Sequence, residues 1–212
     1  MAQQAPDEPR KIPRQARAKA TVEAIVMAAT HILEVEGFEA MTTANVADRA
    51  GVSIGSLYQY FPDKRALAAT AIREMIREFV QSFETALASR RGGTLADTID
   101  TLVDVTLVRH PHMPGRHRML VELAPRLGLS DFSAAASREV ANLIYSALAD
   151  HRGEIASDLD LADAATMIET LLETLGHRAL LEHPVSLQAP VIAEQSRRLM
   201  LSYLKTPFSP QV

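Results

Sequence analysis

The stretch TANVADRAGVSIGSLYQYFPDKRAL, residues 43–67, contains two short helical segments separated by a glycine. Thr42 or Thr43 can cap the first helix at its N-terminus, and Ser53 can cap the second. Gly51 supplies the left-handed backbone conformation that a sharp turn between the helices needs. Two helices of about two turns each, joined by a three-residue turn, are typical of a helix-turn-helix.

The second of these helices has an apolar side and an uncharged polar side. Across the whole motif, the residues expected to face inward are Val46, Ala50, Val52, Leu57 and Phe61, of which Leu57 and Phe61 form the apolar side of this helix. The opposite side presents Gly55, Ser56 and Gln59, which are small or hydrogen-bonding groups suited to meeting base edges in a DNA major groove. The same pattern, as a generic turn between short helices, also fits a helical hairpin in a protein core.

Further polar residues flank the uncharged side. Tyr58 and Tyr60 carry hydroxyls that can donate hydrogen bonds to phosphates. Thr43 and Lys64 lie at helix starts, where backbone N–H groups already favour anions. Contacts of this kind set the register of a protein on DNA, whereas base contacts specify the sequence.

Residues 17–67 resemble the DNA-binding domain of TetR-family regulators. The matching positions are Thr43, Ala50, Gly51, Val52, Ser53, Gly55, Leu57, Tyr58, Tyr60, Phe61, Lys64 and Leu67. The residues for which the resemblance implies phosphate or backbone contacts are Thr43, Ser56, Tyr58, Tyr60 and Lys64. Those that it places toward the bases are Ile54, Gly55, Ser56 and Gln59. Ala44 departs from family members with a long basic residue there, so we expect no base contact from it.

The chain divides into three parts around this motif. Residues 1–16 combine prolines with polar and basic residues, and we expect a flexible basic arm there. Residues 17–67 form the helix-turn-helix DNA-binding domain, whose first helix ends at Gly37. By the resemblance, we expect residues 68–212 to form a larger helical ligand-binding and dimerisation domain. The helices expected from the Pro-Asp break onward cover residues 63–90, 94–109, 116–127, 131–150, 160–182 and 188–204.

The composition predicts an all-α fold, because 47% of the residues are apolar while the chain has only four Tyr, six Phe and no Trp. The absence of cysteine excludes disulfides and thiolate metal sites, and it fits a cytoplasmic protein. We predict no membrane partner, because no apolar run reaches the length of a spanning helix. The net charge of −4 argues against a protein that coats nucleic acid over its whole surface.

For residues 68–212 the family resemblance implies a small-molecule pocket and a homodimer paired through the last two helices. Apolar bands follow both helices, as expected of core or of an interface that a second copy covers. The bands are Leu161, Ala164, Ala165, Ile168, Leu171, Leu172 and Leu175 on the first, and Ile192, Leu199, Met200 and Tyr203 on the second. The residues we expect to line the pocket are Leu102, Thr106, Met119, Leu123, Met167 and Thr170, although each also fits an ordinary core position.

Three histidines, His110, His112 and His117, cluster between the expected helices. Imidazole is a common metal ligand, but no acid lies between Asp104 and Glu122 and several arginines crowd the segment. An anionic ligand or a solvated loop fits better, so we predict no metal and no cofactor.

These features predict a repressor that binds double-stranded DNA at a palindromic operator and is released by a small-molecule effector. The effector would act through the helix that begins at Asp63. An activator or a ligand-independent regulator of the same fold stays open. An all-α enzyme is the alternative from another class, although the sequence contains no Gly-rich phosphate loop and no nucleophile elbow.

Overall fold

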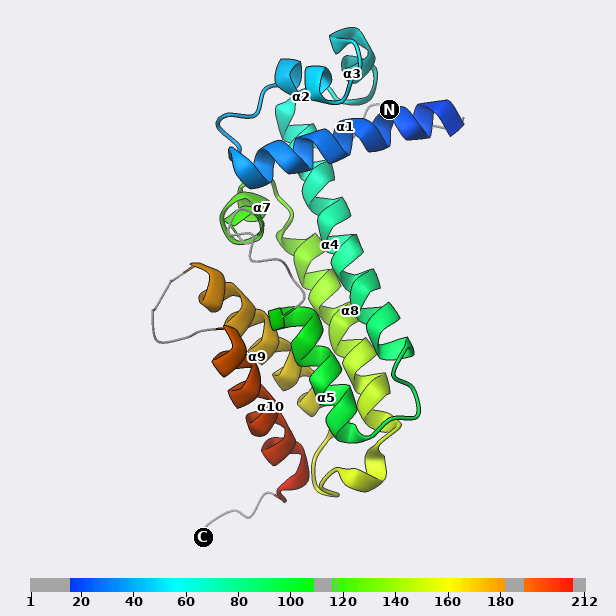
Figure 1. The fold of residues 1–212 in the computed structure, drawn as a ribbon, viewed down its shortest axis with the longest axis vertical. Helices are drawn as coiled ribbons and strands as arrows, with labels where there is room; N and C mark the ends of the chain where they lie inside the picture. The colour runs from blue at the N-terminus through cyan, green and yellow to red at the C-terminus, as the bar shows by residue number, and fades with distance from the viewer. Residues whose placement is uncertain (1–15, 109–115, 117, 182–188, 208–212) are drawn as a thin grey trace. The chain divides into compact units, whose positions relative to one another are not determined.

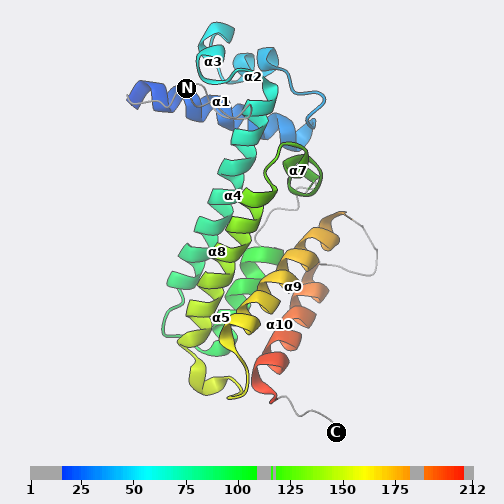
Figure 2. The same ribbon diagram turned by 180° about the vertical axis from the view of Figure 1, so that it is seen from behind.

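The computed structural model of this chain describes residues 16–108, 116, 118–181 and 189–207. These residues form helices joined by turns, with no strand among them, which confirms the all-α prediction (Figures 1 and 2). Apart from Ala16, the expected basic arm lies outside the described residues. Among the described helices, none combines the length and the apolar character that crossing a bilayer requires.

The chain forms two compact units. One contains residues 1–76 and 113–132, and the other contains residues 77–112 and 133–212. The unit that holds the helix-turn-helix therefore extends past residue 67 and includes a segment from the middle of the chain. The functional boundary between residues 67 and 68 stays a prediction.

The first unit is built on four helices from the N-terminal part of the chain. They are α1 (Ala16–Val35), α2 (Thr43–Arg49), α3 (Ile54–Tyr60) and the beginning of α4 (Lys64–Ala88). Gly37 and Gly51 adopt φ angles of 83° and 67°, so each supplies the left-handed residue that follows α1 and α2. Both helix ends lie at the positions predicted from these glycines.

Side-chain caps begin the short helices of this unit. Thr42 caps α2: its hydroxyl accepts a hydrogen bond from Asn45 N–H at 3.1 Å, and Asn45 Oδ1 accepts one from Thr42 N–H at 2.8 Å. Ser53 caps α3 by accepting from Ser56 N–H at 3.1 Å. Asp63 accepts from the third residue of α4, Ala66, at 2.9 Å. The predicted caps are confirmed, with Thr42 and not Thr43 at the start of α2.

The core of the first unit joins these helices through fully buried apolar side chains. They include Ile25, Ala29 and Ile32 of α1, Val46 of α2, Leu57 and Phe61 at α3, and Leu67 and Ile72 of α4. The middle segment belongs to this unit as well, with the π-helix η2 (Met119–Leu123) and α7 (Ala124–Arg126). Arg116 fixes it to α1 through an ion pair in which its Nε lies 2.6 Å from Glu34 Oε1.

The second unit contains the end of α4 and the helices of the C-terminal part. They are α5 (Leu95–Val103), the π-helix η1 (Asp104–Val108), α8 (Ser130–Ala149, which begins in the first unit), the 3-10 helix η3 (Arg152–Glu154), α9 (Leu161–Leu181) and α10 (Ala189–Lys205). Figures 1 and 2 show α9 and α10 side by side. Their buried faces share one apolar core with α5 and α8, to which Ile99, Ile144 and Met200 contribute.

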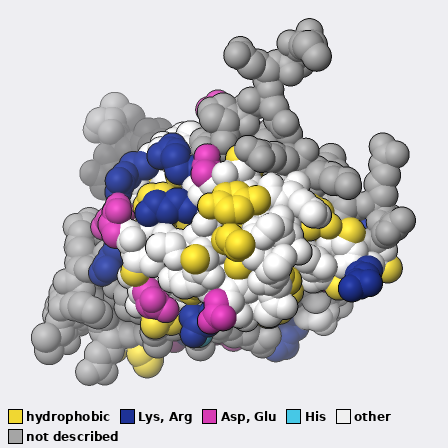
Figure 3. Space-filling model, turned by 90° about the horizontal axis from the view of Figure 1, so that it is seen from above, with side chains coloured by type: hydrophobic (Ala, Val, Ile, Leu, Met, Phe, Trp, Pro, Cys, Tyr) yellow, Lys and Arg dark blue, Asp and Glu magenta, His cyan; other side chains and the backbone are white. Residues whose placement is uncertain are grey.

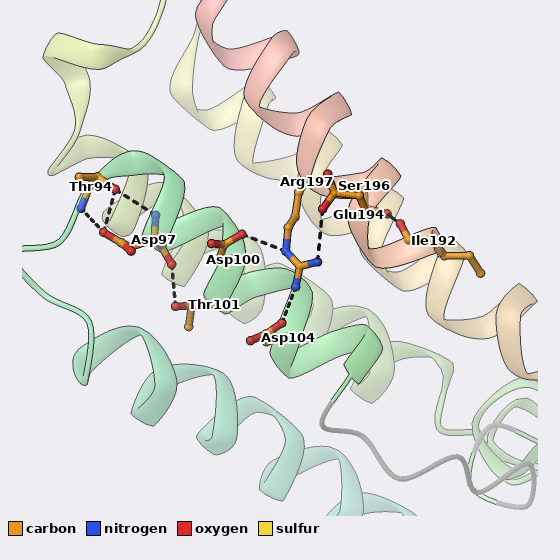
Figure 4. Close-up of polar contacts among 9 residues, drawn as sticks. All are labelled: Thr94, Asp97, Asp100, Thr101, Asp104, Ile192, Glu194, Ser196 and Arg197. Carbon is orange, nitrogen blue, oxygen red and sulfur yellow. Dashed lines mark hydrogen bonds and ion pairs between the residues drawn. The ribbon is translucent and has the colours of Figure 1, made fainter. Parts of the chain in front are cut away.

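A cluster of ion pairs holds α10 against α5 and η1 (Figure 4). Arg197 Nε lies 2.9 Å from Asp100 Oδ1, and its Nη2 lies 2.6 Å from Asp104 Oδ1. The two aspartates are four residues apart, so they share one side of the helix where α5 continues into η1. One guanidinium thereby joins two carboxylates from a segment 93 residues earlier in the chain.

The start of α5 carries a charged version of the cap seen at α2. Thr94 Oγ1 accepts from Asp97 N–H at 3.2 Å, and Asp97 Oδ2 accepts from Thr94 N–H at 2.9 Å. This backbone hydrogen bond, together with the one from the Thr94 hydroxyl, lowers the pKa of Asp97. At α2 the corresponding acceptor is the neutral amide of Asn45.

Exchanging the carboxyl and the amide in the two caps should change the stability in acid in opposite directions. Because the pKa of Asp97 is lower in the folded chain than in the unfolded chain, its contribution is present above the unfolded pKa and is lost as pH falls through the folded pKa. Asp97→Asn should therefore flatten the fall in unfolding free energy below about pH 4. Asn45→Asp should steepen it.

Urea unfolding of both variants and the parent at a series of pH values measures the effect. The matched pair controls for general acid destabilisation, since each variant exchanges only an amide and a carboxyl at the same cap position. If the free energy of unfolding changes with pH in the same way for all three proteins, the prediction is contradicted.

Candidate nucleic-acid interface

Helix α3 turns one side into the core and leaves the other accessible. Leu57 is fully buried, whereas Ile54 and Tyr58 are each 43% exposed. Gly55 and Gln59 are exposed as well, and they lie four residues apart like Ile54 and Tyr58. The accessible side of α3 thus consists of two short rows, one apolar and aromatic, the other a glycine followed by an amide.

Hydroxyl groups connect this surface to the helix starts beside it. Thr43 Oγ1 and the Tyr58 hydroxyl share a hydrogen bond of 3.0 Å, which links the first residue of α2 to the middle of α3. Ser53 Oγ and Ser56 Oγ share another of 2.8 Å. The structure therefore brings together Thr43 and Tyr58, two of the expected phosphate contacts.

Lys64 and Tyr60, two further expected contact residues, are each partly buried. The Lys64 ammonium donates to the backbone carbonyl of Phe38 at 3.3 Å and lies 4.4 Å from the centre of the Phe38 ring. One of the three N–H donors of the Lys64 ammonium is thus already used in a hydrogen bond within the chain. Tyr60 is half-buried in the last turn of α3. No local pattern in the sequence indicates that Phe38 holds Lys64.

The face formed by the first three helices is mostly uncharged. In Figure 3, which looks onto this face, apolar side chains lie near the middle among atoms of uncharged residues and the backbone, and Lys, Arg, Asp and Glu side chains lie around them. The seven residues of α3 include no charged side chain. A charged pair nearby, Arg49 and Glu36, is 3.5 Å apart and exposed.

The six residues expected to line a ligand pocket have different environments. Leu102 is fully buried in the core of the second unit, and Thr106 is buried with its hydroxyl donating to the Leu102 carbonyl at 2.9 Å. Met167 and Thr170 are not buried: Met167 is exposed on α9 and Thr170 follows it one turn later. The other two, Met119 and Leu123, are buried in η2, which belongs to the first unit. Ligand contact by these residues stays a prediction.

The second unit has a polar groove of about 380 Å³ that the sequence pattern did not predict. Its lining includes Asp97, Asp100, Asp104 and Glu194 together with Arg90 and Arg197. The aspartates recur at helical spacing on one side of α5 and η1, which was a detectable signal, but their partner Arg197 is far away in sequence. The three aspartates already have partners within the chain, Asp97 in the cap and the other two in the ion pairs with Arg197.

The apolar bands of the last two helices serve mainly as core. Ala164, Ala165, Ile168, Leu172, Ile192 and Met200 are buried within the single chain. The apolar side chains left exposed on these helices include Met167 at 60%, Val191 at 50% and Leu199 at 56%. Of these three, only Leu199 belongs to the predicted bands.

The three clustered histidines, His110, His112 and His117, lie outside the described residues. Within the described part of the chain, no group of His, Asp and Glu side chains is arranged to hold a metal ion.

Comparison with known proteins identifies both halves of the chain. Residues 25–71 match the family model of the tetR family of bacterial regulatory proteins, and residues 94–204 match that of the tetracyclin repressor-like C-terminal domain. The nucleoid occlusion factor SlmA of Vibrio vulnificus is 37% identical over 87 residues, which is 41% of this chain and 40% of SlmA. The matched part thus spans well under half the length of that relative.

Solved structures resemble the chain over most of its length. FadR from Bacillus subtilis, in complex with stearoyl-CoA, superposes with a TM-score of 0.68 at 18% identity and covers 86% of this chain and 98% of FadR. SmeT in complex with triclosan gives a TM-score of 0.68 at 21% identity and covers 91% of this chain and 96% of SmeT. These likenesses show a shared fold. With both family models matched, the chain belongs to the TetR family of DNA-binding transcription regulators.

Proposed function

We propose that this protein is a homodimeric repressor whose two α3 helices bind a palindromic operator in double-stranded DNA and release it when a small molecule binds the second unit. The observation that carries the proposal is the accessible side of α3, which is exposed, uncharged and fixed at its start by the Ser53 cap. A short helix presented in this way suits the major groove, where base edges offer hydrogen-bond and methyl groups.

Contacts with phosphates are assigned to the residues around α3. Thr43 and Tyr58 already hold each other, so the Tyr58 hydroxyl is positioned at the junction of α2 and α3. Ser56, Tyr60 and Lys64 are the further proposed phosphate contacts, with the Lys64 ammonium sharing its N–H donors between Phe38 and a phosphate. Such contacts fix the orientation of the two recognition helices on the duplex.

The proposed dimer interface lies on the exposed sides of α9 and α10. Met167, Val191 and Leu199 are large apolar side chains left in solvent by the single chain, and they belong to neighbouring helices (Figure 2). Covering them removes apolar surface from water, which favours association. A two-fold dimer also explains how a seven-residue reading helix gains enough base contacts, because each copy reads one half-site.

Selection of binding sites from a random duplex library at about physiological salt tests the DNA-reading role. We expect an inverted repeat with half-sites about one helical turn apart or more. Tyr58→Phe should weaken binding to the recovered site and to unrelated duplexes alike, because it removes a phosphate contact.

Tyr145→Phe is the matched control, because Tyr145 is 45% exposed on α8 and its substitution removes a hydroxyl far from α3 in sequence. Recovery of one asymmetric half-site would contradict the two-fold interpretation. No enrichment by folded protein would contradict sequence-specific binding.

Substitution of Leu199 tests the dimer. Leu199→Glu places a charge at the proposed interface, where burying it without a partner is costly, so we expect the molar mass in sedimentation equilibrium to fall toward that of one chain. Met27→Glu is the control, because Met27 is another exposed apolar side chain but lies on α1. A dimer that persists in Leu199→Glu, with the helix content of the parent, would place the interface elsewhere.

The proposed effector is a small molecule with a large apolar part. The support comes from FadR and SmeT, whose structures hold stearoyl-CoA and triclosan in the shared fold. Coupling would run along α4, which begins in the DNA-reading unit and ends in the second unit, so that the effector and the operator favour different arrangements.

Long-chain acyl-CoA and triclosan serve as the first two probes of this sensing role. Either one should lower affinity for the selected operator, and the operator should lower affinity for the probe by the same factor, because coupling between two sites is reciprocal. Fluorescence anisotropy of labelled operator, with and without probe, measures it. Unchanged operator affinity at saturating amounts of both probes would exclude these two chemical classes as effectors.

A further inference from the structure

Neither the backbone angle nor the space at position 55 requires glycine. Gly55 is the second residue of α3 and is absent from the residues with positive φ. A Cβ atom added there would meet only Ser53 Oγ, at 3.9 Å, which is an ordinary contact. Glycine nevertheless lowers helix stability relative to alanine. The missing side chain therefore points to something that approaches the helix from outside.

The residues around Gly55 show what kind of partner fits. Ile54 precedes it and is exposed, and Gln59 follows one turn later on the same side of α3. An apolar side chain recognises the C5 methyl group of thymine, and a glutamine amide pairs with N6 and N7 of adenine in the major groove. The side chains that most often read guanine, arginine and lysine, are absent from α3.

We propose that α3 reads A·T base pairs at the centre of its half-site, with Ile54 against a thymine methyl group and Gln59 at an adenine, and that Gly55 is bare so that the helix backbone can approach the base edges. This inference rests on the proposed DNA-reading function. It adds the base identity that the site selects and the residue that permits the close approach.

Base analogues in the selected operator test the proposed base contacts of Ile54 and Gln59. Replacing the contacted thymine by uracil removes only the methyl group and should weaken wild-type binding about 4-fold. Replacing the contacted adenine by 7-deazaadenine removes one acceptor and should weaken it roughly 2- to 10-fold. Ile54→Ala should lose its response to uracil and keep its response to 7-deazaadenine, while Gln59→Ala should show the reverse.

The test of Gly55 combines stability with binding. Gly55→Ala should raise the melting temperature, because alanine favours the helix, and yet weaken operator binding by on the order of 10-fold, because the new methyl group holds the helix away from both bases. Gly153→Ala is the control, because a Cβ atom added at Gly153 would meet nothing within 4 Å and this residue lies in η3 of the second unit. It should leave operator binding unchanged.

The outcomes separate this inference from the function beneath it. Two results together support both the proposed function and this inference. They are selection of an inverted repeat, and loss of the response to uracil only in Ile54→Ala and to 7-deazaadenine only in Gln59→Ala. An inverted repeat whose essential pairs are G·C overturns the base assignment, as do equal losses of affinity with the two analogues in all variants. Neither result contradicts the proposed repressor function. Operator binding by Gly55→Ala equal to wild type overturns the close approach. A library with no enriched sequence overturns the proposed function and this inference together.

Discussion

Helix α3, the proposed DNA-reading helix, is too short to be stable by itself, and the first unit is organised around that constraint. Helix α3 has seven residues, whereas isolated helices shorter than about 12–15 residues are marginal in water. The Ser53 hydroxyl satisfies an N–H at its start, and burial of Leu57 and Phe61 fixes its inner side. On its outer side, Tyr58 is linked to α2 through Thr43, while Gly55 and Gln59 are exposed.

The stabilising contacts of the motif are local, which explains why the motif could be predicted from the sequence. The contacts of the residues beside it are distant in sequence and could not be predicted. The caps at Thr42 and Ser53 and the left-handed residue at Gly51 act over three or four residues, so the sequence contains the whole signal. Lys64 also lies at the helix start where the sequence predicts it, but its partner Phe38 is 26 residues away. Contacts over that distance have no local pattern.

The second unit shows the same limit on a larger scale. Helical periodicity predicts α9 and α10, yet it cannot say which apolar residues face inward and which face a second chain. Met167, expected in a pocket wall, is exposed, while Met200, expected in the apolar band that a second copy would cover in part, is fully buried. The pairing of Arg197 with Asp100 and Asp104 joins segments 93 or more residues apart, so only the folded chain reveals it.

The hydrogen bond between Thr43 and Tyr58 has a thermodynamic consequence for any partner of this surface. A tyrosine hydroxyl held at 3.0 Å by a threonine has already lost much of the rotational freedom that docking would otherwise remove. Ordering of side chains is a recurring cost of association. On this surface, part of the entropy cost of ordering the tyrosine is incurred during folding. The aromatic ring is therefore preorganised before it contacts a partner.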